Sequence, residues 1–325
     1  MMHDREGRPI VIKRRTGIGA ALASALFLGL SPIFGRQAIL AGLSPWAVVA
    51  VRTVLAALIV FTAIAVTRRG YLYIYPAGLL GCLLAGGING LGSLLFYGSL
   101  ARINASVGQL LNSTYPIFVA LWLTLDRQPP TRLTVARLLL SLPAIYLLTQ
   151  TDGAGLDLVG VAMMLGAAAL YALHLPINQR VLYEMPAQTV TLYTLVAMSL
   201  VVVPAYFLIP GAEHPPPAGH GGWWPVLGLT LVTLFSRLTL FTGVKHLGGM
   251  QTALLGLFEL IVTVAIANLW LGERLTQTQW IGAGILMAVV LLVAFERGGP
   301  GRLRPGGWLR WLTPPTPEID LSQTR

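Results

Sequence analysis

Three ionisable side chains lie well inside apolar stretches of the sequence: Arg52, Arg237 and Glu259. A charge at the centre of an isolated membrane helix costs at least about 2.5 kcal/mol, so each of these residues marks a candidate functional site. Glu259 is the only carboxylate well inside such a stretch. Because a carboxyl group can exchange a proton or bind a cation, Glu259 is the candidate coupling residue. The alternative is a structural ion pair between Glu259 and Arg237 or Arg52.

The two arginines suggest different roles. Arg237 follows Ser236 near the middle of an apolar run, where a guanidinium can receive an anionic group such as a carboxylate. An internal salt bridge is the alternative for Arg237. Arg52 lies about two helical turns after Pro45, so its long side chain can reach the membrane interface. We therefore expect a structural role for Arg52.

A polar face follows one of the later apolar runs. Gln109, Asn112 and Pro116 are spaced by three and four residues, which places them on one side of a helix, and Tyr115 precedes the proline. A proline frees backbone carbonyls that must be satisfied by neighbours or line a cavity. This face is predicted to form a wall of a central substrate cavity, with hydrogen bonding between helices as the alternative. Further candidates for the same cavity are Asn89, His174 and Asn178.

Ten apolar runs are long enough, or nearly so, to cross a hydrocarbon core as helices, and they lack the polar face of a soluble helix. The prediction is an all-α membrane protein with ten transmembrane helices. Their approximate ranges are 17–40, 45–66, 74–99, 104–125, 133–149, 157–178, 187–209, 224–245, 249–271 and 278–295.

The chain also repeats itself at a nearly constant offset. Pro32 and Arg36 in the first predicted helix recur as Pro176 and Arg180 in the sixth. Two five-helix units, 17–149 and 157–295, are therefore expected. Since five is odd, consecutive copies must insert with opposite orientation, as an inverted repeat with its site between the halves. The four repeated residues are candidates for structural or gating roles, as is Pro116.

The charges are distributed unevenly. With 22 basic and 12 acidic residues the formal net charge is +10, but the basic residues cluster in the termini and in connections on one predicted side. This pattern indicates membrane topology and not a nucleic-acid surface. It predicts a multi-pass protein of the cell (inner or plasma) membrane with both termini cytoplasmic, including a basic, proline-rich tail over 296–325.

Composition and motifs exclude several other classes. A chain with 55% apolar and 10% charged residues is not an ordinary soluble protein. The single cysteine, Cys82, rules out an intramolecular disulfide and a cysteine zinc site. Residues 86–92 are rich in glycine but lack the lysine and preceding strand of a phosphate loop, so they indicate close helix packing or a flexible gate. We expect no metal, no cofactor, no nucleic-acid partner and no enzymatic activity.

The last two apolar runs carry a recognisable pattern. Thr-Ala-Leu-Leu begins at Thr252, Phe-Glu ends at Glu259, Leu-Gly-Glu-Arg-Leu-Thr contains Glu273 at a turn, and Gln-x-x-Gly-x-Gly-Ile opens the last run. The pattern resembles the last two helices of the EamA-type domain in the drug/metabolite transporter superfamily. That family usually has Glu-Pro where this chain has Glu-Leu260, so its proline kink is missing here. Glu273 is a further structural or gating candidate.

The resemblance implies two EamA units that form a secondary transporter. Such a protein would export small metabolites, amino acids among them, by alternating access, with the lipid bilayer as its other partner. Proton coupling through Glu259 and facilitated diffusion both stay open, as do a monomer and a homodimer. The alternative within transporters is an importer or an exchanger of phosphorylated or nucleotide-linked sugars. From a different class, a membrane enzyme or a lipid flippase is the alternative.

Overall fold

The computed structural model describes residues 10–103, 105–125, 132–149, 157–182, 185–209, 223–271 and 277–294. These residues are almost entirely helical, and no strand occurs among them. Two predictions lie outside the described residues, namely the role of Glu273 and the tail 296–325.

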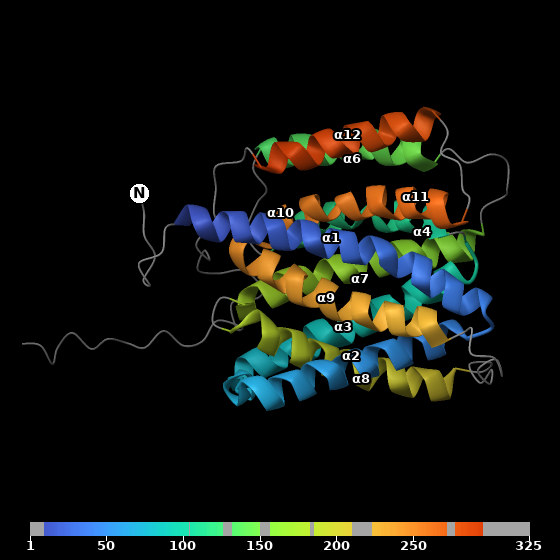
Figure 1. Cartoon of the computed structure of the whole chain (residues 1–325). Helices are drawn as coiled ribbons and strands as arrows, with labels where there is room; N and C mark the ends of the chain where they lie inside the picture. Colours follow the sequence, from blue (N-terminus) through green and yellow to red (C-terminus); the bar gives the residue numbers. More distant parts are fainter. Residues whose placement is uncertain are drawn as a thin grey trace, which may run out of the picture.

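The helices follow the apolar runs closely (Figure 1). In chain order they are α1 (Ile10–Leu40), α2 (Pro45–Thr67), a short 3₁₀ helix η1 (Arg69–Leu72), α3 (Pro76–Leu100), α4 (Ala105–Asn112), α5 (Tyr115–Leu125), α6 (Arg132–Thr149), α7 (Leu158–Leu182), α8 (Ala187–Leu208), α9 (Trp223–Leu247), α10 (Gly249–Gly256), α11 (Phe258–Leu271) and α12 (Gln277–Ala294).

The predicted count of ten transmembrane helices is not confirmed. Seven stretches of the described residues are long and apolar enough to cross a membrane. Two predicted helices, 104–125 and 249–271, are each interrupted, as α4–α5 and α10–α11. The combined lengths of the two broken pairs still match the roughly 20 residues that one crossing requires.

The helices run in roughly the same direction through one bundle. In Figure 1, α6 and α12 lie together along one edge, while α2 and α8 lie along the other. Between these edges, α1 packs against α9 and α11, and α7 packs against α3 and α5. If each helix of α1–α6 is exchanged with its counterpart in α7–α12, the same contacts result. The contact of α1 with α9, for example, becomes that of α7 with α3. The two halves of the chain therefore pack as two copies of one unit.

Local chemistry explains where two of the helices begin. Ser44 precedes α2, and its hydroxyl accepts a hydrogen bond from the backbone N–H of Ala47 at 3.1 Å, while Pro45 occupies the first turn. Asp157 precedes α7, and its Oδ1 accepts hydrogen bonds from the backbone N–H groups of Val159 and Gly160 at 2.9 and 3.2 Å.

The break between α4 and α5 has a local cause. Pro116 lies in the first turn of α5, where its missing N–H is tolerated. The hydroxyl groups of Ser113 and Thr114 donate hydrogen bonds to the carbonyls of Gln109 and Leu111, both at 2.7 Å. The same two carbonyls also accept backbone hydrogen bonds, from the N–H groups of Ser113 at 2.9 Å and Thr114 at 3.2 Å, so each hydroxyl adds a second donor where α4 ends.

The break between α10 and α11 has a tertiary cause. The hydroxyl of Tyr115 donates a hydrogen bond to the carbonyl of Ala253 at 3.0 Å. In a continuous helix that carbonyl would accept from Leu257, whose N–H bonds instead to Leu254 at 3.3 Å. A side chain inserted into the hydrogen-bond ladder is a known cause of helix breaks. Tyr115 thus interrupts this helix without the proline that the family usually has.

The glycine-rich segment 86–92 lies within α3, and at Gly86 it packs closely against α8. A methyl group at Gly86 would lie 2.6 Å from the carbonyl oxygen of Thr194 in α8. Only a residue without a side chain permits the two backbones to approach this closely.

Candidate functional site

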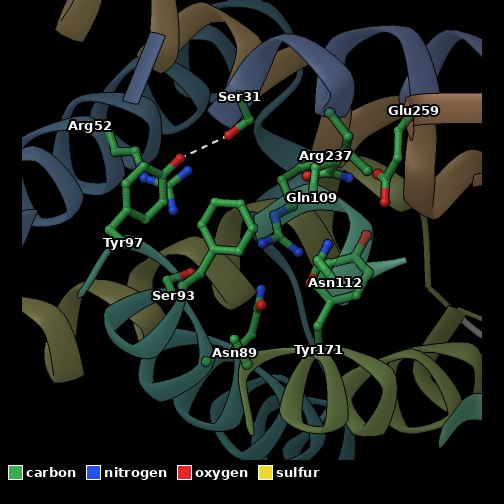
Figure 2. Close-up of a pocket in the computed structure, with 14 residues that line it drawn as sticks. Ser31, Arg52, Asn89, Ser93, Tyr97, Gln109, Asn112, Tyr171, Arg237 and Glu259 are labelled. Carbon is green, nitrogen blue, oxygen red and sulfur yellow. Dashed lines mark hydrogen bonds between the residues drawn. The ribbon is translucent and has the colours of Figure 1, made fainter. Parts of the chain in front are cut away.

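One cavity lies between the two halves of the chain and encloses about 520 Å³, including the part open to solvent. Seven helices contribute its lining, namely α1, α2, α3, α4, α7, α9 and α11. The lining residues are Leu28, Ser31, Arg52, Asn89, Gly92, Ser93, Phe96, Tyr97, Gln109, Asn112, Ala167, Tyr171, Arg237 and Glu259 (Figure 2).

Five residues that the sequence singled out for substrate binding or coupling line this cavity. They come from four separate helices: Asn89, Gln109, Asn112, Arg237 and Glu259. Figure 2 shows Gln109 and Glu259 toward one end of the cavity, with Asn112 and Tyr171 below them. The tertiary fold therefore brings together polar groups that are up to half the chain apart in sequence.

Glu259 lies in the first turn of α11 and is only 2% exposed. Its Oε1 has no hydrogen-bond partner among the described residues, while the side chain of Gln109 lies beside the carboxyl group. Within that same set, Glu259 forms no ion pair with Arg237 or Arg52. The geometry is that of a carboxyl group facing the cavity, and not that of a helix-to-helix salt bridge.

Arg237 is held by polar groups that carry no charge. Its Nη1 lies 3.3 Å from His174 Nε2, and Nδ1 of that histidine is hydrogen-bonded to the carbonyl of Tyr171. The Nδ1 proton therefore goes to the carbonyl, and Nε2 is the acceptor for Arg237. The amide of Asn89 must be oriented with its oxygen toward the guanidinium, where it accepts from Nη1 and Nη2 at 2.7 and 2.5 Å. Arg237 is thus oriented, and its charge is not balanced by a carboxylate in the described part of the chain.

Arg52 lines the cavity at 5% exposure. Its Nη1 donates a hydrogen bond to the hydroxyl of Thr233 at 2.9 Å, and its Cζ lies 4.5 Å from the centre of the Tyr97 ring. The Tyr97 hydroxyl is hydrogen-bonded to Ser31 at 2.8 Å. A second guanidinium therefore faces the same cavity as Arg237 and Glu259.

Three other predicted binding residues lie outside the lining. Tyr115 is buried at the break between α10 and α11, and His174 lies behind Arg237. Asn178 is fully buried, and its Oδ1 accepts a hydrogen bond from Thr194 at 3.4 Å. In this structure these side chains position other groups and do not face the cavity.

The predicted structural or gating residues lie within or beside the helices. Pro32 and Pro176 are inside α1 and α7, and Pro116 is buried in α5. Arg36 donates hydrogen bonds to the carbonyls of Leu100 and Ile103, which joins α1 to the end of α3. Arg180 is buried at the corresponding place in α7.

Five polar or aromatic residues of the lining were not predicted from the sequence: Ser31, Ser93, Phe96, Tyr97 and Tyr171. A signal existed for three of them. Ser31 precedes the repeated Pro32, while Phe96 and Tyr97 lie inside a segment that resembles one in the second half, Leu-Phe-x-Gly. Ser93 and Tyr171 carried no such signal.

Metal binding has no support in the described residues. No group of three or more His, Cys, Asp or Glu side chains lies together there.

Arg102 and Asp157 form an ion pair at 3.0 Å. It connects the loop after α3 to the start of α7, outside the apolar spans.

The known proteins and the family model with similar sequences are named as transporters. The model of the EamA-like transporter family matches residues 15–150 and 158–295. The threonine/homoserine exporter RhtA of Escherichia coli K12 is 31% identical over 209 residues, which span 62% of this chain and 65% of that protein. The uncharacterized transporter YwfM of Bacillus subtilis 168 is 21% identical over 62% of this chain and 68% of its own length.

A solved crystal structure has the same fold. It superposes with a TM-score of 0.68 at 14% sequence identity and covers 86% of this chain and 96% of the other. The family match extends over most of the chain and contains both copies of the repeated unit. The resemblance seen in the sequence is therefore confirmed: this chain is a multi-pass membrane protein and belongs to the EamA-like transporter family of the drug/metabolite transporter superfamily.

Proposed function

We propose that this protein is a secondary transporter that exports small amino acids or related compounds by alternating access. The observation that carries the proposal is the presence of Arg237 and Glu259 in one cavity, each at least 95% buried and not paired with the other. Isolated buried charges are costly, so they are retained where a ligand supplies the opposite charges.

An amino acid in its zwitterionic form supplies both charges. Its carboxylate would lie against the guanidinium of Arg237, which can donate two parallel hydrogen bonds. Its ammonium group would lie against Glu259 and the side-chain oxygens of Gln109 and Asn112. Support also comes from the name of the relative RhtA, a threonine/homoserine exporter, since threonine and homoserine are small amino acids.

Glu259 would also link transport to a proton gradient. A proton and the substrate's ammonium group would compete for the same carboxylate, so the site would hold one or the other. Each outward movement of substrate would then be coupled to inward movement of a proton. Facilitated diffusion, by contrast, needs no group that binds both.

The proposed architecture is an inverted repeat with ten membrane crossings. Each broken helix, α4–α5 and α10–α11, counts as one crossing, and both termini lie in the cytoplasm of a cell-membrane protein. The matching contacts of the two halves and the basic residues of the termini and connections support this arrangement.

The test is uptake of threonine and homoserine into proteoliposomes, with and without an imposed pH gradient. Wild type is compared with Glu259→Gln and Arg237→Gln, and with Arg69→Gln as a control that removes an exposed arginine outside the cavity. We expect the gradient to drive wild type and the control. Glu259→Gln should still exchange substrate but lose the response to the gradient.

Two results would contradict the proposal. If Glu259→Gln responds to the gradient as wild type does, Glu259 is not the coupling group. If Arg237→Gln binds substrate with wild-type affinity, Arg237 does not hold the carboxylate. A loss of one buried, charged hydrogen-bonding group typically lowers affinity by about tenfold or more.

A further inference from the structure

We infer that Arg52 forms a second anion-binding subsite in the cavity, so that the favoured substrate is an amino acid with an acidic side chain. The inference rests on the proposed function, because it assigns the substrate class of the same cavity. Figure 2 shows Arg52, Tyr97 and Ser31 at the end of the cavity away from Glu259. A substrate that spans the cavity would therefore present different groups to its two ends.

The guanidinium of Arg52 has hydrogen-bonding capacity that the protein leaves unused. An arginine carries five N–H donors. Within the described part of the chain, Arg52 donates one hydrogen bond, to Thr233. Its Nε is buried and has no partner there. A carboxylate in the cavity would satisfy such donors and balance the charge.

The orientation of Arg52 is fixed by its neighbours. The guanidinium carbon lies over the face of the Tyr97 ring at 4.5 Å, a favourable cation–π geometry. Tyr97 is itself held by its hydrogen bond to Ser31 and by contact with α1, where a methyl group at Gly35 would lie 2.4 Å from the ring. A charged group that is held in position before the ligand arrives loses little entropy on binding.

Charge balance selects the substrate class. The described lining of the cavity carries two guanidinium groups, Arg52 and Arg237, and one carboxyl group, Glu259. With Glu259 ionised, a zwitterion without a side-chain charge leaves one buried positive charge uncompensated. An amino acid with an acidic side chain carries one ammonium and two carboxylates, so every charge has a partner. Because an uncompensated buried charge is costly, the acidic substrate should bind more tightly.

The other role for Arg52 is purely structural, with Thr233 and Tyr97 as its intended partners. The two roles differ in what substitution does to selectivity. A structural arginine affects all substrates alike, since it acts through the fold. A subsite arginine affects the acidic substrates more than the neutral ones.

The experiment is counterflow in proteoliposomes containing the full chain. Aspartate and glutamate are compared with threonine and homoserine for wild type, Arg52→Gln, Arg52→Lys and Thr233→Val. We expect wild type to prefer the acidic pair. Arg52→Gln should lower the affinity for aspartate or glutamate by about tenfold more than that for threonine. Arg52→Lys should keep part of the acidic preference, and Thr233→Val, which removes only the supporting hydroxyl, should keep most of it.

Several results would overturn the inference. If wild type transports threonine and homoserine but neither acidic compound, the inference fails while the proposed function stands. If Arg52→Gln weakens all four substrates equally, Arg52 is structural. If wild type transports none of them, the proposed function fails as well. If Arg52→Gln does not fold, the test is the preference of wild type for the acidic substrates and the change of that preference in Arg52→Lys. If Arg52→Lys changes the affinity for all four substrates equally, Arg52 does not form the subsite.

Discussion

Gly256 sits where Tyr115 enters the break between α10 and α11, and its substitution tests how that break is maintained. A methyl group at Gly256 would lie 1.8 Å from the Tyr115 hydroxyl oxygen and 3.2 Å from the ring carbon that carries it. Tyr115 is 2% exposed, so its ring has little room to move aside. Gly256→Ala should therefore displace the hydroxyl from the carbonyl of Ala253.

The expected loss of stability is about 3 kcal/mol. A buried carbonyl left without its donor costs about 1–3 kcal/mol, and overpacking typically costs another 1–3 kcal/mol. The better helix propensity of alanine returns about 0.5–1 kcal/mol. Glu259 is three residues beyond Gly256, so transport should fall more than overall stability alone would explain.

The assay is thermal or denaturant unfolding of the purified protein in detergent, together with gradient-driven uptake. Gly284→Ala in α12 is the matched control, because no atom outside its own local helix lies within 4 Å of the added methyl group. The double variant Tyr115→Phe/Gly256→Ala lacks the hydroxyl, which leaves the ring carbon at 3.2 Å as the nearest contact. It should be more stable than the sum of the two single effects predicts.

If Gly256→Ala is as stable as Gly284→Ala, the added methyl group does not displace Tyr115. If the effects of Tyr115→Phe and Gly256→Ala on stability are simply additive, the hydroxyl and the new methyl group do not meet.

Two further predictions concern helix packing and a surface charge. Gly86→Ala should lower the melting temperature by several degrees because the methyl group would meet the backbone of Thr194. Gly87→Ala is the control and should have little effect, since the nearest atom to its added methyl group is 3.9 Å away. Equal melting temperatures of the two variants would contradict this prediction. The hydrogen bond from Arg102 lowers the pKa of Asp157 below its ordinary value of 3.8, so the stabilisation is present above about pH 4 and is lost as the pH falls through the folded-state pKa. Asp157→Asn keeps a helix-capping side chain but removes the charge. Its melting temperature should be slightly lower than that of wild type at neutral pH, and this difference should shrink in acid. A difference that does not depend on pH would count against the ion pair.

Much of the fold follows from the sequence alone. Apolar runs of membrane length predicted the helices to within a few residues at most of their ends, since a helix is the local way to satisfy its backbone in a lipid environment. The repeated residues around Pro32 and Pro176 indicated two units, and the family match contains both. The rarity of charges within apolar runs was enough to single out Arg52, Arg237 and Glu259.

Contacts between distant segments decided the rest. The sequence around Leu260 has no proline, so the break before Glu259 was not evident there; it depends on the hydroxyl of Tyr115, which comes from the other half of the chain. The same holds for Arg52, which faces the cavity because Thr233 of α9 and Tyr97 of α3 hold it there. Hydrophobicity acts along the chain and can be read locally, whereas hydrogen bonds and ring contacts between helices depend on which side chains the fold brings within a few ångströms of one another.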